Sequence, residues 1–250
     1  MSGSGRRAPW GPPWATNAGS EEPRWEESFP FLTALVALAQ MPQRRGAGSL
    51  THDVVHTSRY NGRVNTRDRL VAATRELMWE KGYAATSPKD IQRAAGAGQG
   101  SMYHHFSGKE DLAVTAMEQT AASVRHDLEQ LLSGPWTAPE RLERYLTYQR
   151  DCLRGCRIGR MTSDAEVVVS TALRAPVSET FTWLIDALTR IIADGVAAGE
   201  LSRTVRPPEL ASVVVAVVQG GYVLARAQGE TAPFDTAIRG AIYLLRAVAI

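Results

Sequence analysis

A cluster of side chains suited to hydrogen bonding occupies one short stretch of this chain. Gln99, Ser101 and Tyr103 can both donate and accept hydrogen bonds, and two histidines follow them. Groups of this kind near the N-terminal end of a short helix can reach base edges in the major groove of duplex DNA. His104 and His105 are adjacent, so on a helix they point about 100° apart and cannot easily bind one metal ion. The pattern favours contact with a nucleic acid over a metal site.

Two short helices joined by a glycine turn are expected to position this cluster. Ser87 can cap the first helix, Asp90 can complete a capping box with it, and Pro88 suits the first helical position. Gly96 can end that helix because glycine adopts a positive φ without a steric penalty. The second helix is expected to begin near Gly98. The arrangement predicted is a helix-turn-helix, a DNA-reading motif.

The same segment resembles the DNA-binding motif of TetR-type transcriptional regulators over about residues 65 to 124. Two positions depart from the family pattern, since Gly98 stands where Ser or Thr is frequent and Gln99 where Lys is frequent. A glycine cap is only a few tenths of a kcal/mol weaker than serine, so the helix is still expected to form. The missing lysine predicts an operator different from those of close relatives. The resemblance is carried by Ala94-Ala95-Gly96, by Gly100-Ser101-Met102-Tyr103-His104-His105-Phe106 and by Lys109-Glu110-Asp111-Leu112, and it extends backward through Thr66-Arg67-Asp68-Arg69-Leu70 and Lys81-Gly82-Tyr83.

The resemblance and the side-chain chemistry together imply which residues contact DNA. Tyr103 can contact a phosphate or a thymine methyl group, and the alternative is a position in the core. The resemblance implies that His104 is the histidine that faces DNA. Lys109 adds positive charge where a helix N-terminus also favours an anion. Lys89 can contact a phosphate or simply be solvated. The full predicted set is Thr86, Ser87, Lys89, Gln99, Gly100, Ser101, Tyr103, His104 and Lys109.

Composition restricts the function only weakly. The 250 residues carry a net charge of +2, and residues 65–125 hold eight Lys or Arg against seven Asp or Glu. Charge alone therefore does not identify a nucleic-acid-binding protein. Cys152 and Cys156 are too few for a disulfide framework and suit a reducing cytoplasm, and no metal-ligand spacing accompanies them.

The first 64 residues differ from the rest of the chain. They are rich in Gly, Pro, Ser and Trp without a sustained period, which predicts a disordered N-terminal extension. The apolar run at residues 31–39 is too short to span a membrane, and the glutamates before it argue against a secretion signal. Patterned sequence begins abruptly at Thr66, which suggests a natural start near Met41 or Val64.

From Thr66 onward the pattern predicts an all-α fold. Thr66 and Ser107 are expected to cap the first helix and a long helix that ends near residue 132. The long helix carries an apolar stripe and would join an N-terminal three-helix helix-turn-helix domain (65–125) to an all-helical effector-binding and dimerisation domain (126–250). The stripe comprises Met117, Ala121, Val124, Leu128 and Leu131, and further helices are predicted at Pro139–Arg154, Asp164–Leu173, Pro176–Ala198, Pro208–Gly229 and Pro233–Val248.

The last two predicted helices carry apolar faces that can pair with a second copy of the chain. The resemblance implies such a homodimer, since the last two helices of each subunit form a four-helix bundle in the family and a two-fold reader needs two half-sites. Ordinary packing within one subunit is the alternative. The faces are Leu210, Val214, Val217, Gly221 and Leu224, and Phe234, Ile238, Ala241, Leu245 and Val248.

Aromatic residues of the second half can line a cavity for a hydrophobic or aromatic effector, or can fill the core. The turn at Arg154-Gly155-Cys156 resembles the LmrA/YxaF-like branch of the family, which regulates drug-efflux genes. A group of five arginines can bind an anionic effector or form a solvated face. The cavity candidates are Trp136, Tyr145, Tyr148, Phe181, Trp183 and Tyr222, and the arginines are Arg144, Arg150, Arg154, Arg157 and Arg160.

No nucleophile–base pair and no phosphate-binding glycine loop occurs in the sequence, so we expect neither an enzyme nor a cofactor. The predicted function is that of a cytoplasmic, nucleoid-associated homodimeric repressor, released from a palindromic DNA operator by a small hydrophobic or aromatic ligand. The alternative is a DNA-binding regulator that is constitutive or controlled by a protein partner, with no effector. A membrane partner is not expected. A cavity within residues 133–230 would favour the first reading.

Overall fold

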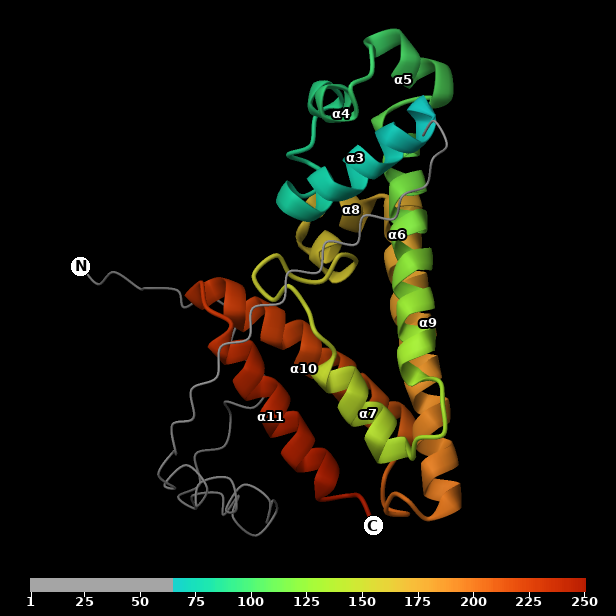
Figure 1. Ribbon diagram of the computed structural model, residues 1–250, viewed down its shortest axis with the longest axis vertical. Coiled ribbons are helices and arrows are strands. Elements are labelled where there is room, and N and C mark those ends of the chain that lie inside the picture. The colour runs from blue at the N-terminus through green and yellow to red at the C-terminus, as the bar shows by residue number, and fades with distance from the viewer. Residues whose placement is uncertain (1–64) are drawn as a thin grey trace, which may run out of the picture. The chain divides into compact units, whose positions relative to one another are not determined.

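The computed structural model describes residues 65–250, and the predicted N-terminal extension lies outside the described residues. Residues 65–250 are helical, as predicted, and their one β-type pairing is an isolated bridge between Leu201 and Ala249. Figure 1 shows the element order. The elements are α3 (Thr66–Lys81), α4 (Pro88–Ala95), α5 (Gln99–His105), α6 (Lys109–Leu132), α7 (Ala138–Thr147), the 3-10 helix η1 (Gly159–Ser163), α8 (Ala165–Val169), α9 (Thr171–Ala198), α10 (Pro207–Gln228) and α11 (Ala232–Arg246).

The residues that precede α3 and α6 as N-caps are Asn65 and Gly108, so both predicted caps are wrong by one residue. Asn65 caps α3 in place of Thr66, because its side-chain oxygen accepts a hydrogen bond from the Asp68 N–H at 2.8 Å. Gly108 precedes α6. The N–H and hydroxyl of Ser107 both donate to the Asp111 carboxylate, at 2.9 and 3.1 Å, so this serine does not cap the helix through its own side chain.

The predicted helix from 139 to 154 is too long, because α7 ends at Thr147. The guanidinium group of Arg150 turns back and donates to the carbonyl oxygens of Tyr145, Leu146 and Tyr148, at 2.5, 3.2 and 2.6 Å. These carbonyls lie at the end of α7 and would otherwise need other partners. Arg150 therefore replaces the next helical turn, and residues 148–158 form an irregular connection that we call the strap.

The segment predicted as one helix over Asp164–Leu173 is divided between two elements. Asp164 caps the short α8, and Ser170 then caps α9 by accepting from the Leu173 N–H at 3.2 Å. Since α9 starts at Thr171, Pro176 lies inside that helix rather than in its first turn.

Within residues 65–250, three clusters of buried side chains form the core, and α6 contributes to each. Leu112 belongs to the cluster of the helix-turn-helix, Met117 to a cluster shared with η1, α8 and α9, and Leu128 to the cluster of the C-terminal helices. The predicted stripe of α6 is thus confirmed as a packing surface. The predicted boundary at residue 125 lies inside α6 and stays a prediction, because the middle cluster joins residues on both sides of it.

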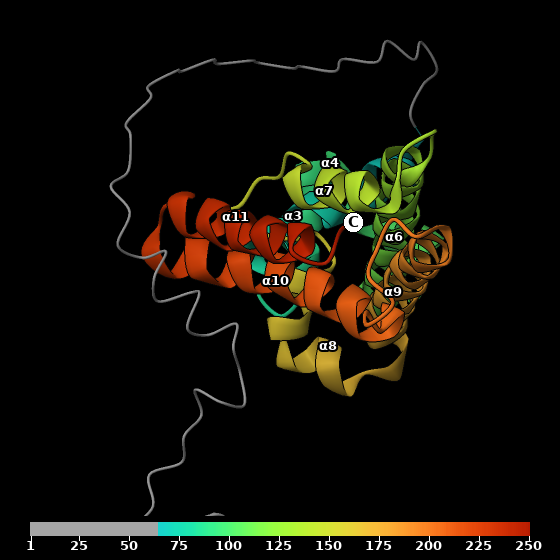
Figure 2. The same cartoon turned by 90° about the horizontal axis from the view of Figure 1, so that it is seen from below.

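Helices α10 and α11 pack side by side, which Figures 1 and 2 both show. The faces predicted to meet a second copy are mostly core of this chain. Val214, Ile238 and Leu245 are buried, and the Phe234 ring lies 5.1 Å from that of Tyr222. Leu224, which is 48% exposed, is an exception, so most of the predicted contact residues pack within this subunit, which was the alternative.

The opposite faces of these two helices carry the exposed apolar side chains. They are Val213 and Val223 on α10 and Tyr243 and Leu244 on α11, each between 45% and 67% exposed, and Leu224 of the predicted face is exposed beside them. By length and composition α10 could also cross a membrane, but its other face packs against α9 and α11, as in a core helix.

Candidate DNA interface and effector pocket

The predicted capping box at the start of α4 is present in full. Ser87 accepts from the Asp90 N–H at 3.2 Å, and the Asp90 carboxylate accepts from the Ser87 N–H at 3.3 Å. Lys81 at the end of α3 donates to the same carboxylate at 2.8 Å. Together with the bonds from Ser87, this contact holds the pKa of Asp90 well below its usual range. Gly96 ends α4 with φ 57°, the left-handed conformation predicted for it.

Helix α5 presents one buried and one exposed face. Met102 is fully buried in the cluster of the helix-turn-helix and so fixes the rotation of α5 about its axis. Tyr103 is 53% exposed, and Gln99, Gly100 and His104 are also exposed. The core alternative for Tyr103 is thereby excluded, and Gln99, Tyr103 and His104 lie on the solvent face, whereas Ser101 is only partly exposed.

The remaining predicted DNA contacts lie in different environments. Lys89 is exposed, and Lys109 is partly buried with its Nζ 3.9 Å from the centre of the Tyr83 ring. Thr86 is only 1% exposed, and its hydroxyl donates to the Gly82 carbonyl at 2.6 Å. Thr86 therefore supports the turn between α3 and α4, and its side chain is not available to a phosphate. The hydroxyl of Ser87 is similarly engaged with Asp90.

Two arginines that the sequence reasoning missed lie beside the motif. Arg69 donates to the carbonyl of Gly96 at 3.5 Å and to Thr66 at 3.2 Å. The guanidinium of Arg67 lies 5.3 Å from the centre of the Phe106 ring. Basic residues in the first turn of α3 were the available signal, since that helix end meets the turn between α4 and α5. Both belong to the candidate interface.

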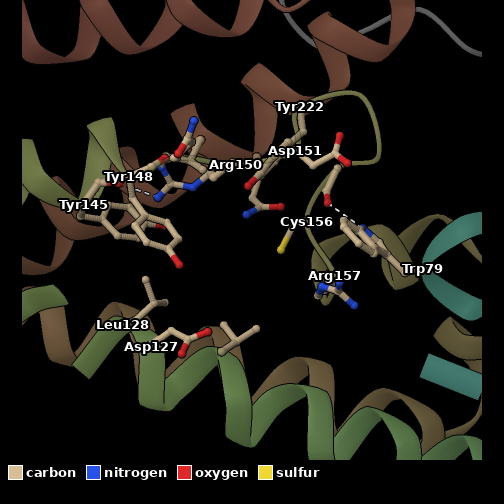
Figure 3. Close-up of a pocket in the computed structure, with 15 residues that line it drawn as sticks. Trp79, Asp127, Leu128, Tyr145, Tyr148, Arg150, Asp151, Cys156, Arg157 and Tyr222 are labelled. Atoms are coloured by element: carbon tan, nitrogen blue, oxygen red, sulfur yellow. Dashed lines mark hydrogen bonds between the residues drawn. The ribbon is translucent and has the colours of Figure 1, made fainter. Parts of the chain in front are cut away.

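A cavity of about 230 Å³ lies between α6, α7, α10 and the strap, as Figure 3 shows. Three of the predicted residues, Tyr145, Tyr148 and Tyr222, line it. Burial raises the pKa of Tyr145 to about 12 and also raises the pKa of Tyr222, so both phenols stay neutral at physiological pH. The other lining residues are Trp79, Val124, Asp127, Leu128, Gln149, Arg150, Asp151, Gly155, Cys156, Arg157, Val218 and Gln219.

The other predicted cavity residues lie elsewhere. Phe181 lines a neighbouring hollow of about 140 Å³ beside the strap. Trp183 packs against the C-terminal cluster. Trp136 lies in the connection between α6 and α7, with the Arg144 guanidinium 4.6 Å from its ring centre.

Arg150 shapes the cavity wall as well as the end of α7. Its guanidinium carbon lies 5.0 Å from the ring centre of Tyr145 and 5.2 Å from that of Tyr148. Cation–π contacts of this length add to the three carbonyl bonds in fixing both rings. Of the five predicted arginines, Arg150 and Arg157 line the cavity.

Both cysteines are free thiols. Cys152 is buried, whereas Cys156 is partly exposed and lines the cavity, with its sulfur drawn toward the open space in Figure 3. The Gly159 N–H donates to that sulfur at 3.2 Å. Within residues 65–250 no group of three or more His, Cys, Asp or Glu side chains is placed to hold a metal ion.

Comparison with known proteins gives a family match for each half of the described chain. Residues 70–116 match the model of bacterial regulatory proteins of the tetR family, and residues 139–241 match the tetracyclin repressor-like C-terminal domain. The HTH-type transcriptional repressor DhaR of Mycobacterium sp. (strain GP1) is 24% identical over 69% of this chain and 88% of its own. The Bacillus subtilis regulators YxaF and LmrA are each 24% identical over 68% of this chain and 90% of their own.

Solved structures agree with this placement. A TetR-family regulator from Agrobacterium tumefaciens superposes with a TM-score of 0.66 at 26% identity, over 74% of this chain and 98% of its own. A TetR-family regulator from Cytophaga hutchinsonii superposes with a TM-score of 0.68 at 25% identity, over 74% of this chain and 95% of its own. The matched proteins are transcriptional regulators, not enzymes.

Proposed function

Because the chain belongs to the TetR family of DNA-binding transcriptional regulators, we propose that it is a homodimeric repressor released from a palindromic operator by a small aromatic ligand. One observation carries the proposal: α5 buries Met102 and leaves Tyr103, Gln99 and Gly100 on a common exposed face. A helix held in this way can enter the major groove without rearranging its core. An operator-binding protein acts in the cytoplasm, at the nucleoid.

The exposed apolar faces of α10 and α11 support the homodimer. A pair of neighbouring helices that buries one face and exposes apolar residues on the other can form a four-helix bundle with a second copy. Such a dimer would hold the two copies of α5 about 34–36 Å apart, the spacing of successive major grooves. A dimer contact also accounts for the apolar outer face of α10 without a membrane.

The aromatic cavity favours control by a small-molecule ligand. The alternative, a regulator that is constitutive or controlled by a protein partner, does not need such a cavity. It lies against α6, and α6 is packed into the core of the helix-turn-helix as well as into the C-terminal core. A ligand that binds one arrangement of α6 better than another shifts the population between them. A coupling free energy of about 1–3 kcal/mol would weaken operator binding about 5- to 150-fold.

Selection of duplexes from a random-sequence pool by the purified full-length protein tests the DNA-reading part of the proposal. We expect enrichment of a sequence with two-fold symmetry and half-sites one helical turn apart. Equal binding to selected and random duplexes at moderate ionic strength would contradict the proposal. Enrichment of a single asymmetric half-site would contradict only the dimer.

A further inference from the structure

The indole of Trp79, near the end of α3, is held by the strap. Its Nε1–H donates to the carbonyl of Gly155 at 2.9 Å. The guanidinium carbons of Arg154 and Arg157 lie 3.4 and 3.6 Å from its ring centre. Two guanidinium groups at these distances cannot share one face of a ring, so they cover its two faces. We call this arrangement the Trp79 clamp.

Further contacts tie α3 to the same part of the chain. Glu76, one turn before Trp79, pairs with Arg157 at 2.7 Å and with Arg154 at 3.3 Å. The guanidinium of Arg160 donates to the Trp79 carbonyl at 2.7 Å. Helix α3, the first helix of the DNA-binding domain, is therefore bonded to the strap through the side chains of Glu76 and Trp79 and to η1 through its own backbone.

The clamp is also part of the cavity wall. Trp79, Gly155 and Arg157 all line the cavity, and Figure 3 shows Trp79 and Arg157 together at one end of it. An occupant of the cavity thus meets α3 directly, without the intervention of α6. The indole face that Arg157 covers is the face for which a ligand can compete.

We propose that the Trp79 clamp transmits occupancy of the cavity to the helix-turn-helix, with Arg157 as its moving part, and that the ligand is a planar aromatic molecule. This inference rests on the proposed function and specifies its ligand class and its route of coupling. The ligand stacks on the Trp79 face from which Arg157 is displaced, between walls formed by Tyr145 and Tyr222. Displacement of Arg157 also breaks its pairing with Glu76, which frees α3 to shift against the strap.

Cys156 allows the test to proceed without knowledge of the natural ligand. Monobromobimane, a planar bicyclic reagent, alkylates thiols and would place its rings in the cavity next to the clamp. A Cys152→Ala background restricts labelling to Cys156. The duplex is the one selected by the unlabelled protein, and its dissociation constant is measured with and without the label. A Cys156→Ala chain treated in the same way controls for the reagent.

In the background chain we expect the label to weaken duplex binding at least about fivefold, the lower end of typical allosteric coupling. In Trp79→Phe, which loses the Gly155 bond, and in Glu76→Gln, which loses both ion pairs, the effect of the label should fall below about twofold. Glu76 is 55% exposed, so its variant folds even if the buried Trp79 position does not tolerate change. Trp136→Phe, which alters a cation–π pair far from α3, should keep the full effect.

The outcomes separate this inference from the proposed function. If the label weakens binding equally in all clamp variants, coupling does not run through Trp79 and the inference is overturned, while ligand control stands. If the label has no effect in the background chain, the inference falls together with ligand control through this cavity. If no duplex is selected at all, the DNA-reading proposal itself fails.

Discussion

The ammonium group of Lys109 lies 3.9 Å from the centre of the Tyr83 ring, which links the first residue of α6 to the start of the turn after α3. The contact holds a positive charge at a helix N-terminus, where backbone N–H groups also attract an anion. Tyr83 is buried, so the ring against which this ammonium group lies is held by the core. A cation at this place is suited to a phosphate of the DNA backbone.

Lys109→Met should weaken binding to selected and random duplexes alike, because a phosphate contact carries no sequence information. The methionine keeps an apolar contact with Tyr83, so the melting temperature should change little. The slope of log K against log salt concentration should fall by about 1. Lys109→Arg, which keeps the charge, is the control. An altered sequence preference would show that the residue reads bases instead.

Tyr103→Ala should weaken binding to the selected duplex by about 1–3 kcal/mol and binding to random duplexes much less, if the ring contacts a base edge. Since Tyr103 is 53% exposed, circular dichroism should show an unchanged fold. Tyr103→Phe separates the two predicted contacts. Retained specificity in the Phe variant indicates a thymine methyl contact, and equal losses in both variants indicate a phosphate bond from the hydroxyl.

Local features of the fold could be predicted from the sequence because their partners are close in the chain. Ser87 and Asp90 are three residues apart, and the box they form follows from helix geometry alone. The Trp79 clamp could not be predicted, since Trp79 and Gly155 are 76 residues apart and no periodic pattern links them. Arg150 could not be predicted for a different reason: its partners are only two to five residues away, but hydrophobic periodicity does not show that its side chain returns to the end of α7 and ends that helix at Thr147.

The register of α10 shows a second limit. Val213, Val214 and Val215 are consecutive, so an apolar face can be drawn on either side of the helix. The structure buries Val214 and Val215 and exposes Val213. Hydrophobic periodicity identified a helix with two apolar faces but could not decide which one packs within the subunit.

Two glycines of the motif should respond oppositely to a side chain. Gly96 has φ 57°, so Gly96→Ala should destabilise the protein by about 1–2 kcal/mol, the cost of a left-handed conformation for an L-residue. Gly98 has φ −72° and no neighbour within 4 Å of an added Cβ, and it is the N-cap of α5. Gly98→Ser should therefore stabilise by a few tenths of a kcal/mol. Urea denaturation measures both, and equal effects of the two changes would contradict this account.

The lowered pKa of Asp90 predicts how the stability of the fold changes in acid. Its pKa is depressed in the folded chain, first by the bond from Lys81 and then by those from Ser87. A depressed carboxyl pKa stabilises the fold above the unfolded value of about 3.9 and loses that contribution as pH falls further. Asp90→Asn should therefore be less stable than the parent at pH 7, and the gap in unfolding free energy should narrow below about pH 4. A gap that stays constant down to pH 3 would show that the charge of Asp90 contributes nothing.

The exposed faces of α10 and α11 predict the oligomeric state and its link to DNA binding. Leu244→Glu places a charge in the centre of the proposed contact, where burial without a partner is costly. Sedimentation should then show a monomer, and affinity for the two-fold duplex should fall toward that for a single half-site, while the fold persists because Leu244 is 45% exposed in the single chain. Val169→Glu makes the same chemical change at an apolar side chain that is 80% exposed on α8, and it should leave the dimer intact. A dimeric Leu244→Glu protein would place the subunit contact on another surface, and the spacing of the two reading helices would then have to be derived from that surface instead.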